Sequence, residues 1–290
     1  MPTLAYAAPA TVDEAVRILA GASGPAKILS GGTDLLVQLR SGRAKPSLIV
    51  DTKKIPGISG IREENGVFII GAATPGAVIG ECEALRRAWP GVVEAANLIG
   101  STQVQGRASL AGNLCNASPA ADSVPALIAA RATCVVVGSN GRREVAVETI
   151  ATGPGRTSLA RDEFIVAFHL PKRPPRSADA YLRFIPRTEM DIAVVGAAVN
   201  VTLDRAGACT DARVVLGAVA PTAVLVPDAA AALIGRKLDE TALAGLDKAA
   251  RAACKPINDK RGTIEYRTKV AGVIGRRAAA MAFERAGERQ

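Results

Sequence analysis

Hydrophobic and polar positions in the first fifty residues follow the order strand, helix, strand. The short apolar run AKILS at 26–30 is typical of a buried strand, and SLIVD at 47–51 has the same character. Between them, DLLVQLRSG at 34–42 has the spacing of an amphipathic helix and is closed by Gly42, since glycine commonly ends helices. The pattern therefore predicts a compact βαβ unit over 26–51.

A second α/β segment follows. The pattern predicts strands at 66–74 and 133–139, a helix over 84–100 interrupted near Pro90, and a short helix at 126–131. Asn140-Gly141 stands between alternating apolar runs and predicts a β-hairpin over 135–147. The polar stretch 100–125 has no such pattern, and we expect a loop there. A loop of that length is uncommon in a compact domain unless it is functional.

The Pro- and Arg-rich segment LPKRPPRSADA at 170–180 predicts a linker, because consecutive prolines continue neither a helix nor a central strand. Beyond it the pattern predicts antiparallel strands at 191–203 and 212–220, helices at about 228–234 and 240–254, and a basic C-terminal helix. We therefore expect a second domain of the α+β class.

These elements predict two domains in the 290 residues. The first would cover 1–175 and contain two α/β lobes, at about 1–55 and 56–175. The second would cover 176–290 and combine an antiparallel sheet with helices.

The net charge of +9 is concentrated near the C-terminus, where residues 251–290 hold ten Lys and Arg against four Asp and Glu. In that segment an apolar stripe is formed by Val270, Ile274, Ala278, Met281 and Phe283, and we expect arginines on the opposite face. A solvated helix face or a docking surface for a partner explains this charge. Nucleic-acid binding is disfavoured because the chain has only three Tyr, five Phe and one Trp for stacking on bases.

The sequence contains no apolar run long enough to span a membrane and no signal-peptide pattern, so we expect a cytoplasmic protein. No two of the five cysteines are closer than nineteen positions, which disfavours clustered zinc, iron–sulfur and CxxC sites. His169 is the single histidine and lies at a predicted strand end, where a structural role is the expectation. We therefore assign no metal ligands and no catalytic residues.

Two glycine-containing loops are the candidate binding features. In the stretch KILSGGTDLLVQLR, Gly31 and Gly32 would allow positive φ and a close approach of backbone N–H groups to a ligand, and the following helix N-terminus favours phosphate. The alternative is a tight βα turn that binds nothing. The second loop, RASLAGNLCNASPAAD, offers small residues at Ser109, Ala111 and Gly112 around a charged, extended ligand.

Asp122 ends the second loop. Its carboxylate could accept hydrogen bonds from ligand hydroxyls, or it could cap the helix that begins near Ser123. Neither loop is GxGxxG, and GxxxxGK[ST] does not occur, so neither a Rossmann site nor a P-loop is supported.

Four stretches together resemble a known family: KILSGGTDLLVQLR, IGSTQVQGRASLAGNLCNASPAADSVP, YLRFIPRTEMDIAVVGAAV and YRTKVAGVIGRRA. They are similar, nearly end to end, to the FAD-binding medium subunit of molybdenum hydroxylases, the group of xanthine dehydrogenase and aerobic carbon monoxide dehydrogenase. The resemblance implies an α+β fold: a two-lobed FAD-binding domain of the vanillyl-alcohol oxidase and p-cresol methylhydroxylase (PCMH) type, followed by the C-terminal domain of the carbon monoxide dehydrogenase flavoprotein type.

The resemblance also implies the residues that bind FAD non-covalently between the lobes. The first loop would wrap the pyrophosphate through Lys27, Ile28, Leu29, Ser30, Gly31, Gly32, Thr33, Asp34 and Leu35. The second would face the phosphates through Ser109, Leu110, Ala111, Gly112 and Asn113, although many relatives have two glycines where this chain has Ala111-Gly112. Asp122 would hold FAD hydroxyls, Ile99 and Ile165 would contact FAD, and Arg183 would lie near the isoalloxazine, where its charge stabilises the reduced anionic flavin.

By the same resemblance, the chain would be an oxidoreductase subunit that transfers electrons. A large partner subunit would carry the molybdenum cofactor and a small one two [2Fe–2S] clusters. FAD in this chain would then reduce an external acceptor, and a dimer of heterotrimers would be the assembly. Two alternatives remain open from the residues: a stand-alone flavin-dependent oxidase of the same fold, and a non-catalytic assembly or binding protein without flavin.

Overall fold

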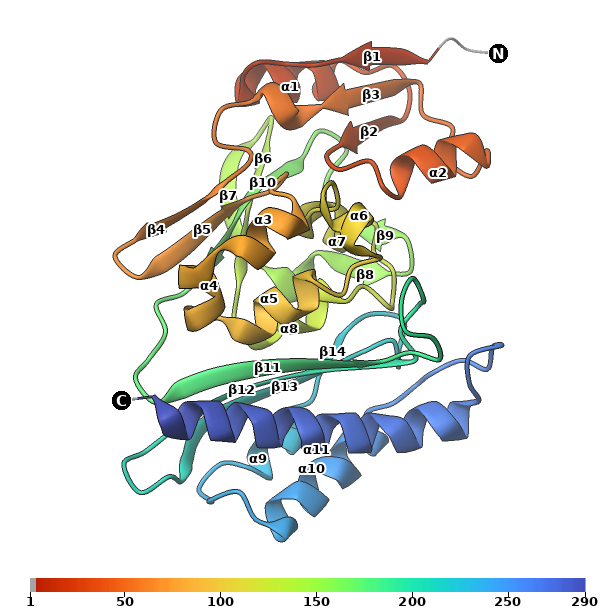
Figure 1. Ribbon diagram of the computed structural model, residues 1–290. Coiled ribbons are helices and arrows are strands. Elements are labelled where there is room, and N and C mark those ends of the chain that lie inside the picture. Colours follow the sequence, from red (N-terminus) through yellow and green to blue (C-terminus); the bar gives the residue numbers. More distant parts are fainter. Residues whose placement is uncertain (1–3, 290) are drawn as a thin grey trace.

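Two hydrophobic cores organise residues 4–289, the part of the chain that the computed structural model describes. The first core lies inside two N-terminal lobes, and the second lies between a C-terminal sheet and its helices (Figure 1). The result is a two-domain fold of mixed helices and largely antiparallel sheets. No helix within this part of the chain has the length and apolar character needed to cross a bilayer.

The first lobe is a three-stranded sheet of order β1-β3-β2 with two helices. Its elements are β1 (Ala5–Ala7), α1 (Val12–Ala20), β2 (Ala26–Leu29), α2 (Leu35–Arg40) and β3 (Leu48–Asp51). Strands β2 and β3 are parallel, with Ala26 opposite Leu48, so the predicted βαβ unit is confirmed. The sequence pattern did not predict β1 and α1. The Thr11 side chain caps α1 by accepting a hydrogen bond from the Glu14 N–H.

The second lobe contains an antiparallel sheet of order β4-β5-β10-β6-β7. Its strands are β4 (Ile61–Glu64), β5 (Val67–Gly71), β6 (Thr133–Gly138), β7 (Gly141–Ala146) and β10 (Phe164–Leu170). A small two-stranded ribbon is formed by β8 (Ala151–Gly153) and β9 (Arg156–Thr157). The predicted hairpin is confirmed, because β6 and β7 pair around Asn140-Gly141 and Gly141 has a φ of 96°. His169 lies in β10, as expected, with Nδ1 3.1 Å from a carboxylate oxygen of Glu144.

Six short helices pack in this lobe: α3 (Gly76–Glu81), α4 (Glu83–Ala88), α5 (Pro90–Ala96), α6 (Thr102–Gln105), α7 (Leu110–Cys115) and α8 (Ser123–Ala129). The interruption at Pro90 is confirmed, since this proline is the first residue of α5. The expectation of a long loop at 100–125 was wrong. Ser101 and Ser109 cap α6 and α7 through their side chains, so local capping makes this polar stretch helical.

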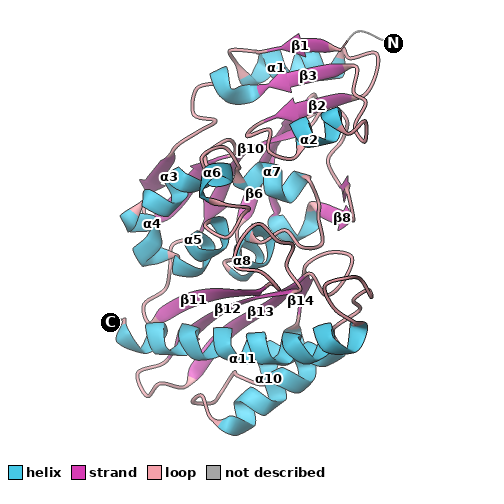
Figure 2. Ribbon diagram, turned by 45° about the vertical axis from the view of Figure 1, so that its right-hand side comes forward, coloured by secondary structure: helices cyan, strands magenta, loops and turns pink. Residues whose placement is uncertain are grey.

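The C-terminal domain places four strands, in the order β11-β12-β13-β14, against three helices (Figure 2). The strands are β11 (Ser177–Phe184), β12 (Val195–Leu203), β13 (Cys209–Gly217) and β14 (Val224–Leu225), and the helices are α9 (Pro227–Ala231), α10 (Glu240–Ala252) and α11 (Ile264–Glu288). The predicted linker is shorter than expected. Only 171–176 connects β10 to β11, because the last proline, Pro175, precedes the alternating sequence that forms β11.

Strand β11 has two chemically different faces. Ala178 and Ala180 belong to the core shared with α11, whereas Tyr181 belongs to the core of the N-terminal domain. Helices α5 and α8 cover the sheet on the N-terminal side, and α11 covers the other side (Figures 1 and 2). The alternation along β11 therefore joins the two domains.

The predicted apolar stripe of α11 is confirmed, and Ile274, Ala278 and Phe283 are buried. The expectation that arginines occupy only its opposite face was wrong. Arg267 is 3% exposed, and it donates to the carbonyl of Val194 and forms an ion pair with Asp259 at 2.7 Å. Arg267 therefore fixes the loop before the helix as well as the start of β12.

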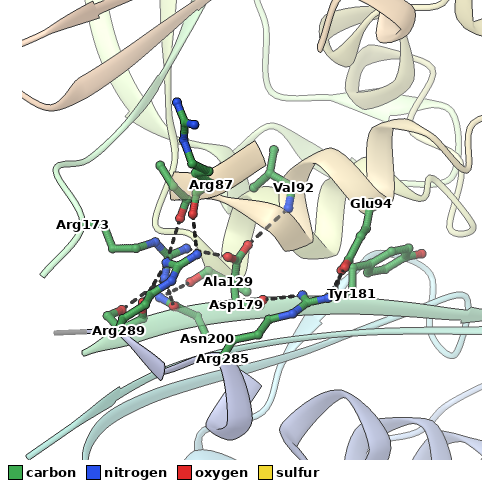
Figure 3. A network of polar contacts seen from close by, with 12 residues as sticks. Arg87, Val92, Glu94, Ala129, Arg173, Asp179, Tyr181, Asn200, Arg285 and Arg289 are labelled. Carbon is green, nitrogen blue, oxygen red and sulfur yellow. Dashed lines mark hydrogen bonds and ion pairs between the residues drawn. The ribbon is translucent and has the colours of Figure 1, made fainter. Parts of the chain in front are cut away.

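A buried carboxylate, Asp179, holds the junction between the domains (Figure 3). It accepts hydrogen bonds from the Val92 N–H of α5 at 3.2 Å and from the Arg173 guanidinium at 2.5 Å. Its backbone carbonyl accepts from Arg285 of α11, whose guanidinium also pairs with Glu94. The junction therefore unites α5, the 171–176 connection, β11 and α11.

We predict that Asp179→Ala lowers the free energy of unfolding by about 3 kcal/mol, because it leaves the buried Arg173 guanidinium without its carboxylate. Denaturant unfolding would measure the change. As a control, Asp211→Ala removes the half-exposed ion pair with Arg131 and should cost less than about 1 kcal/mol. Equal losses in the two variants would contradict the role given to Asp179.

Candidate functional site

A cavity of about 760 Å³ lies between the two lobes of the N-terminal domain. Its walls are the turn from β2 into α2, the segment around α7, and the segment that leads into β10. It brings together these predicted residues: Lys27, Ile28, Ser30, Gly31, Gly32, Thr33, Asp34, Leu35, Ile99, Ser109, Ala111, Gly112, Asn113 and Ile165. The predicted residues that do not line it are Leu29, Leu110, Asp122 and Arg183.

The two glycines of the first loop serve different purposes. Gly32 has a φ of +79°, a left-handed conformation that favours glycine. Gly31 does not have a positive φ, contrary to the expectation from the sequence. A Cβ atom at Gly31 would instead lie 1.9 Å from the carbonyl oxygen of Arg107. Gly31 is therefore required because the backbones of the two loops touch.

Serine side chains connect the same two loops. The hydroxyls of Ser30 and Ser109 lie 2.8 Å apart, and Ser109 also accepts a hydrogen bond from the Gly112 N–H as the N-cap of α7. A further contact across the cavity joins Gln38 to Asn116, with Nε2 and Oδ1 at 2.9 Å. These contacts fix the position of one cavity wall relative to the other, although the residues that make them are nearly eighty positions apart in the sequence.

Asn113 and Asp122 use their side chains in ways that the sequence did not predict. Asn113 Oδ1 accepts hydrogen bonds from the N–H and the hydroxyl of Ser123, and so holds the start of α8. Asp122 occupies the N-cap position of α8 without a capping hydrogen bond. Its carboxylate accepts instead from the Tyr181 hydroxyl at 3.0 Å and from Arg183 at 2.9 Å.

Arg183 reaches the cavity wall through a backbone contact. Its guanidinium is buried, forms the ion pair with Asp122, and donates to the Leu98 carbonyl at 2.7 Å. Leu98 precedes Ile99, which lines the cavity. Burial raises the pKa of Asp122 to about 6, and the charge of Arg183 opposes that shift. The pair therefore supports the wall from behind.

Two cationic side chains line the cavity itself, Lys27 and Arg161. Arg161 donates to the carbonyls of Ala22 and Gly24, at 2.9 and 2.5 Å, and so ties the β9–β10 segment to the first lobe. Sequence reasoning missed Arg161 because it lies in an irregular segment far from both glycine loops. Its proximity to them follows only from the pairing of β10 within the sheet.

The cavity is suited to binding a ligand, and its lining includes a carboxylate, Asp34, whose pKa is raised by burial. Backbone groups of two loops and two cations meet an apolar wall that includes Ala72, Phe164 and Ile165, which fits a ligand with an anionic part and an apolar part. Glu163 is engaged by Arg143 and by the Ala160 N–H. Burial raises the pKa of the Cys115 thiol to about 12, so this thiol stays protonated at neutral pH.

Comparison with known proteins agrees with this architecture. Residues 2–173 match the model of the FAD binding domain in molybdopterin dehydrogenase, and residues 180–282 match the CO dehydrogenase flavoprotein C-terminal domain. The chain is 33% identical to the carbon monoxide dehydrogenase medium chain of Hydrogenophaga pseudoflava over 98% of both proteins. It is 30% identical to the xanthine dehydrogenase FAD-binding subunit of Escherichia coli O157:H7 over 97% of both.

Solved structures give the same result. A chain of carbon monoxide dehydrogenase from Hydrogenophaga pseudoflava superposes with a TM-score of 0.93, at 34% identity, over 98% of this chain and 99% of that one. A chain of quinoline 2-oxidoreductase from Pseudomonas putida 86 superposes with a TM-score of 0.90, at 26% identity, over 99% of both.

We predict a specific pH dependence from Asp122. Because its pKa is raised in the folded state above the usual value of about 3.9, the folded chain binds more protons than the unfolded chain between about pH 4 and 6. Its contribution to stability is therefore complete below about pH 4 and is lost as the pH rises to about 6. The unfolding free energy relative to Asp122→Asn should fall by about 2 kcal/mol across this window. Denaturant unfolding at several pH values would measure it, and a flat or rising difference would contradict the assignment.

Proposed function

This chain belongs to the family of FAD-binding medium subunits of molybdenum hydroxylases, and we propose that it passes electrons from a partner subunit to an external acceptor through FAD held in the cavity between its lobes. The observation that carries the proposal is the contact of the two glycine loops at Gly31. At this contact, one wall of the cavity consists of exposed backbone, because the glycine has no side chain to cover it.

The residues present fit a flavin dinucleotide. The volume of about 760 Å³ lies in the range of cofactor pockets. In our proposal the loops at 30–35 and 109–113 hold the pyrophosphate, supported by the charges of Lys27 and Arg161. Ile99 and Ile165 contribute apolar contact. Leu29 and Leu110, which do not line the cavity, hold the backbone of their loops in place.

Asp122 and Arg183 complete the proposed site. The Asp122 carboxylate does not line the cavity and accepts hydrogen bonds from Tyr181 and Arg183, so in our proposal it positions Arg183 instead of binding cofactor hydroxyls as the sequence suggested. The Arg183 guanidinium would stabilise negative charge that accumulates near the cavity on reduction. Their ion pair and the bond to the Leu98 carbonyl keep that positive charge at a fixed position beside Ile99. FAD, when bound, supplies the capacity to accept electrons singly and to release them singly or in pairs.

We further propose that the electrons come from [2Fe–2S] clusters in a small partner subunit, which receives them from a large subunit with the molybdenum cofactor. The assembly would be a dimer of heterotrimers. The names of the relatives support partner subunits, because they denote a medium chain and a FAD-binding subunit. The substrate belongs to the large subunit in this proposal, which agrees with relatives that serve carbon monoxide and xanthine dehydrogenases.

The first test is the flavin content of the purified chain and of Gly31→Ala. We expect stoichiometric, non-covalent FAD in the unchanged chain and a loss of most of it in the variant, because the new methyl group forces the two loops apart. Absorption spectra and release of flavin on denaturation would measure both. Gly287→Ala is the matched control, since a Cβ there has no neighbour within 4 Å. Full flavin content in Gly31→Ala would refute the loop assignment.

Arg183→Ala tests the proposed electrostatic role. Removal of the positive charge should lower the flavin midpoint potential by about 30 mV, equivalent to about 1.4 kcal/mol for a two-electron couple, while FAD stays bound. Spectroelectrochemical titration would measure the potential. Arg131→Ala, which removes a half-exposed arginine paired with Asp211, should leave the potential unchanged. An unchanged potential in Arg183→Ala would remove Arg183 from the flavin environment.

A further inference from the structure

A groove rich in arginine runs along the junction of the two domains. Two hollows of about 640 and 650 Å³ share Arg87 and Arg289 in their lining, and we call them together the basic groove. Seven Lys and Arg side chains line it against three Glu. These cations come from α4, from the 171–176 connection and from the C-terminal end of α11, so the fold gathers them from three distant parts of the sequence.

Several of these cations have no carboxylate partner. Arg289 donates to the carbonyls of Ala88 and Ser177, at 3.2 and 2.9 Å, and to that of Arg87. The Arg87 side chain is 77% exposed and approaches Glu83 only to 3.9 Å. Among the residues described, Lys172 forms neither a side-chain hydrogen bond nor an ion pair. The positive charge of the groove is therefore incompletely neutralised within the chain.

The cations also repel one another. Burial lowers the pKa of Arg173 to about 10, the charge of Asp179 opposes this shift, and the charge of Arg289 adds to it. The pKa of Arg289 is lowered by burial and, to a smaller extent, by the charge of Arg285, while the charge of Asp179 opposes the shift. Within residues 4–289, the buried nitrogens Trp89 Nε1 and Arg173 Nε have no acceptor. The lining of the groove thus has an excess of positive charge, which an anionic group would relieve.

We propose that the basic groove binds an extended acidic segment of a partner polypeptide. The two hollows are joined through shared residues, and Pro90, Val93, Pro174 and Pro175 add apolar lining between the cations. A chain of alternating carboxylates and short apolar groups matches this arrangement, and the planar guanidinium binds a carboxylate through two parallel hydrogen bonds. The inference goes beyond the proposed function and does not require flavin.

The chain contains a reporter for this interaction. Trp89 is its single tryptophan, it lines the groove, and the Arg173 guanidinium lies 3.6 Å from the centre of its ring. An occupant that attracts Arg173 would change this stacking and hence the tryptophan emission. We would titrate the full chain with a synthetic octaglutamate peptide and record both binding heat and Trp89 fluorescence.

We expect saturable binding that changes the Trp89 emission and weakens as the salt concentration rises. The double variant Arg87→Glu with Lys172→Glu should bind about tenfold more weakly, because both side chains are exposed in the groove and both charges are reversed. The matched control is Arg277→Glu with Lys269→Glu, two exposed residues of α11 outside the groove. It carries the same change in net charge and should bind as the unchanged chain does.

Three results would overturn the proposal. One is the absence of saturable binding in low salt. Another is an equal loss of affinity in the two double variants, which would assign the binding to net charge alone. The third is inorganic pyrophosphate that binds as tightly as the peptide and competes with it, which would make the groove a site for small anions.

Discussion

The buried carboxylate of Asp179 is the constraint on which the arrangement of the two domains depends. A carboxylate removed from water must be paired and hydrogen-bonded, and here the partners of this β11 side chain come from α5 and the 171–176 connection. Gly91 adds a steric condition, because a Cβ atom there would lie 2.6 Å from an oxygen of Asp179. The Asp179 carboxylate therefore obtains its hydrogen bonds and its ion pair only when the two domains are packed together.

The consequences of this docking extend along β11. Asp179, Tyr181 and Arg183 are alternate residues, so they lie on one face of the strand and point toward the N-terminal domain. Asp179 meets α5, whereas Tyr181 and Arg183 meet Asp122. The carboxylate that fixes the junction thus also fixes the register of the arginine that stands behind the cavity wall. The domain junction at Asp179 in this way determines where the positive charge of Arg183 lies beside the cavity.

The sequence was informative where a single local signal determined the structure. The βαβ unit over 26–51, the Asn140-Gly141 hairpin and the break at Pro90 follow from turn chemistry and periodicity, and all three are present. The prediction of a loop at 100–125 was wrong, because serine side chains cap short helices there that the hydrophobic periodicity does not reveal. The predicted linker was too long, because the prolines at 174 and 175 obscured the alternation SADAYLRF that forms β11.

The cavity, too, has features that the local sequence reveals and features that only the folded chain reveals. The two glycine loops are visible in the sequence, but the reason for Gly31 is not, because Arg107 approaches it only in the folded chain. The same contact, together with the Ser30–Ser109 hydroxyl pair, joins the two loops along one side of the cavity. A substitution on either loop at this contact would therefore also displace the opposite wall of the cavity, so the shape of the cavity depends on residues of both lobes at once.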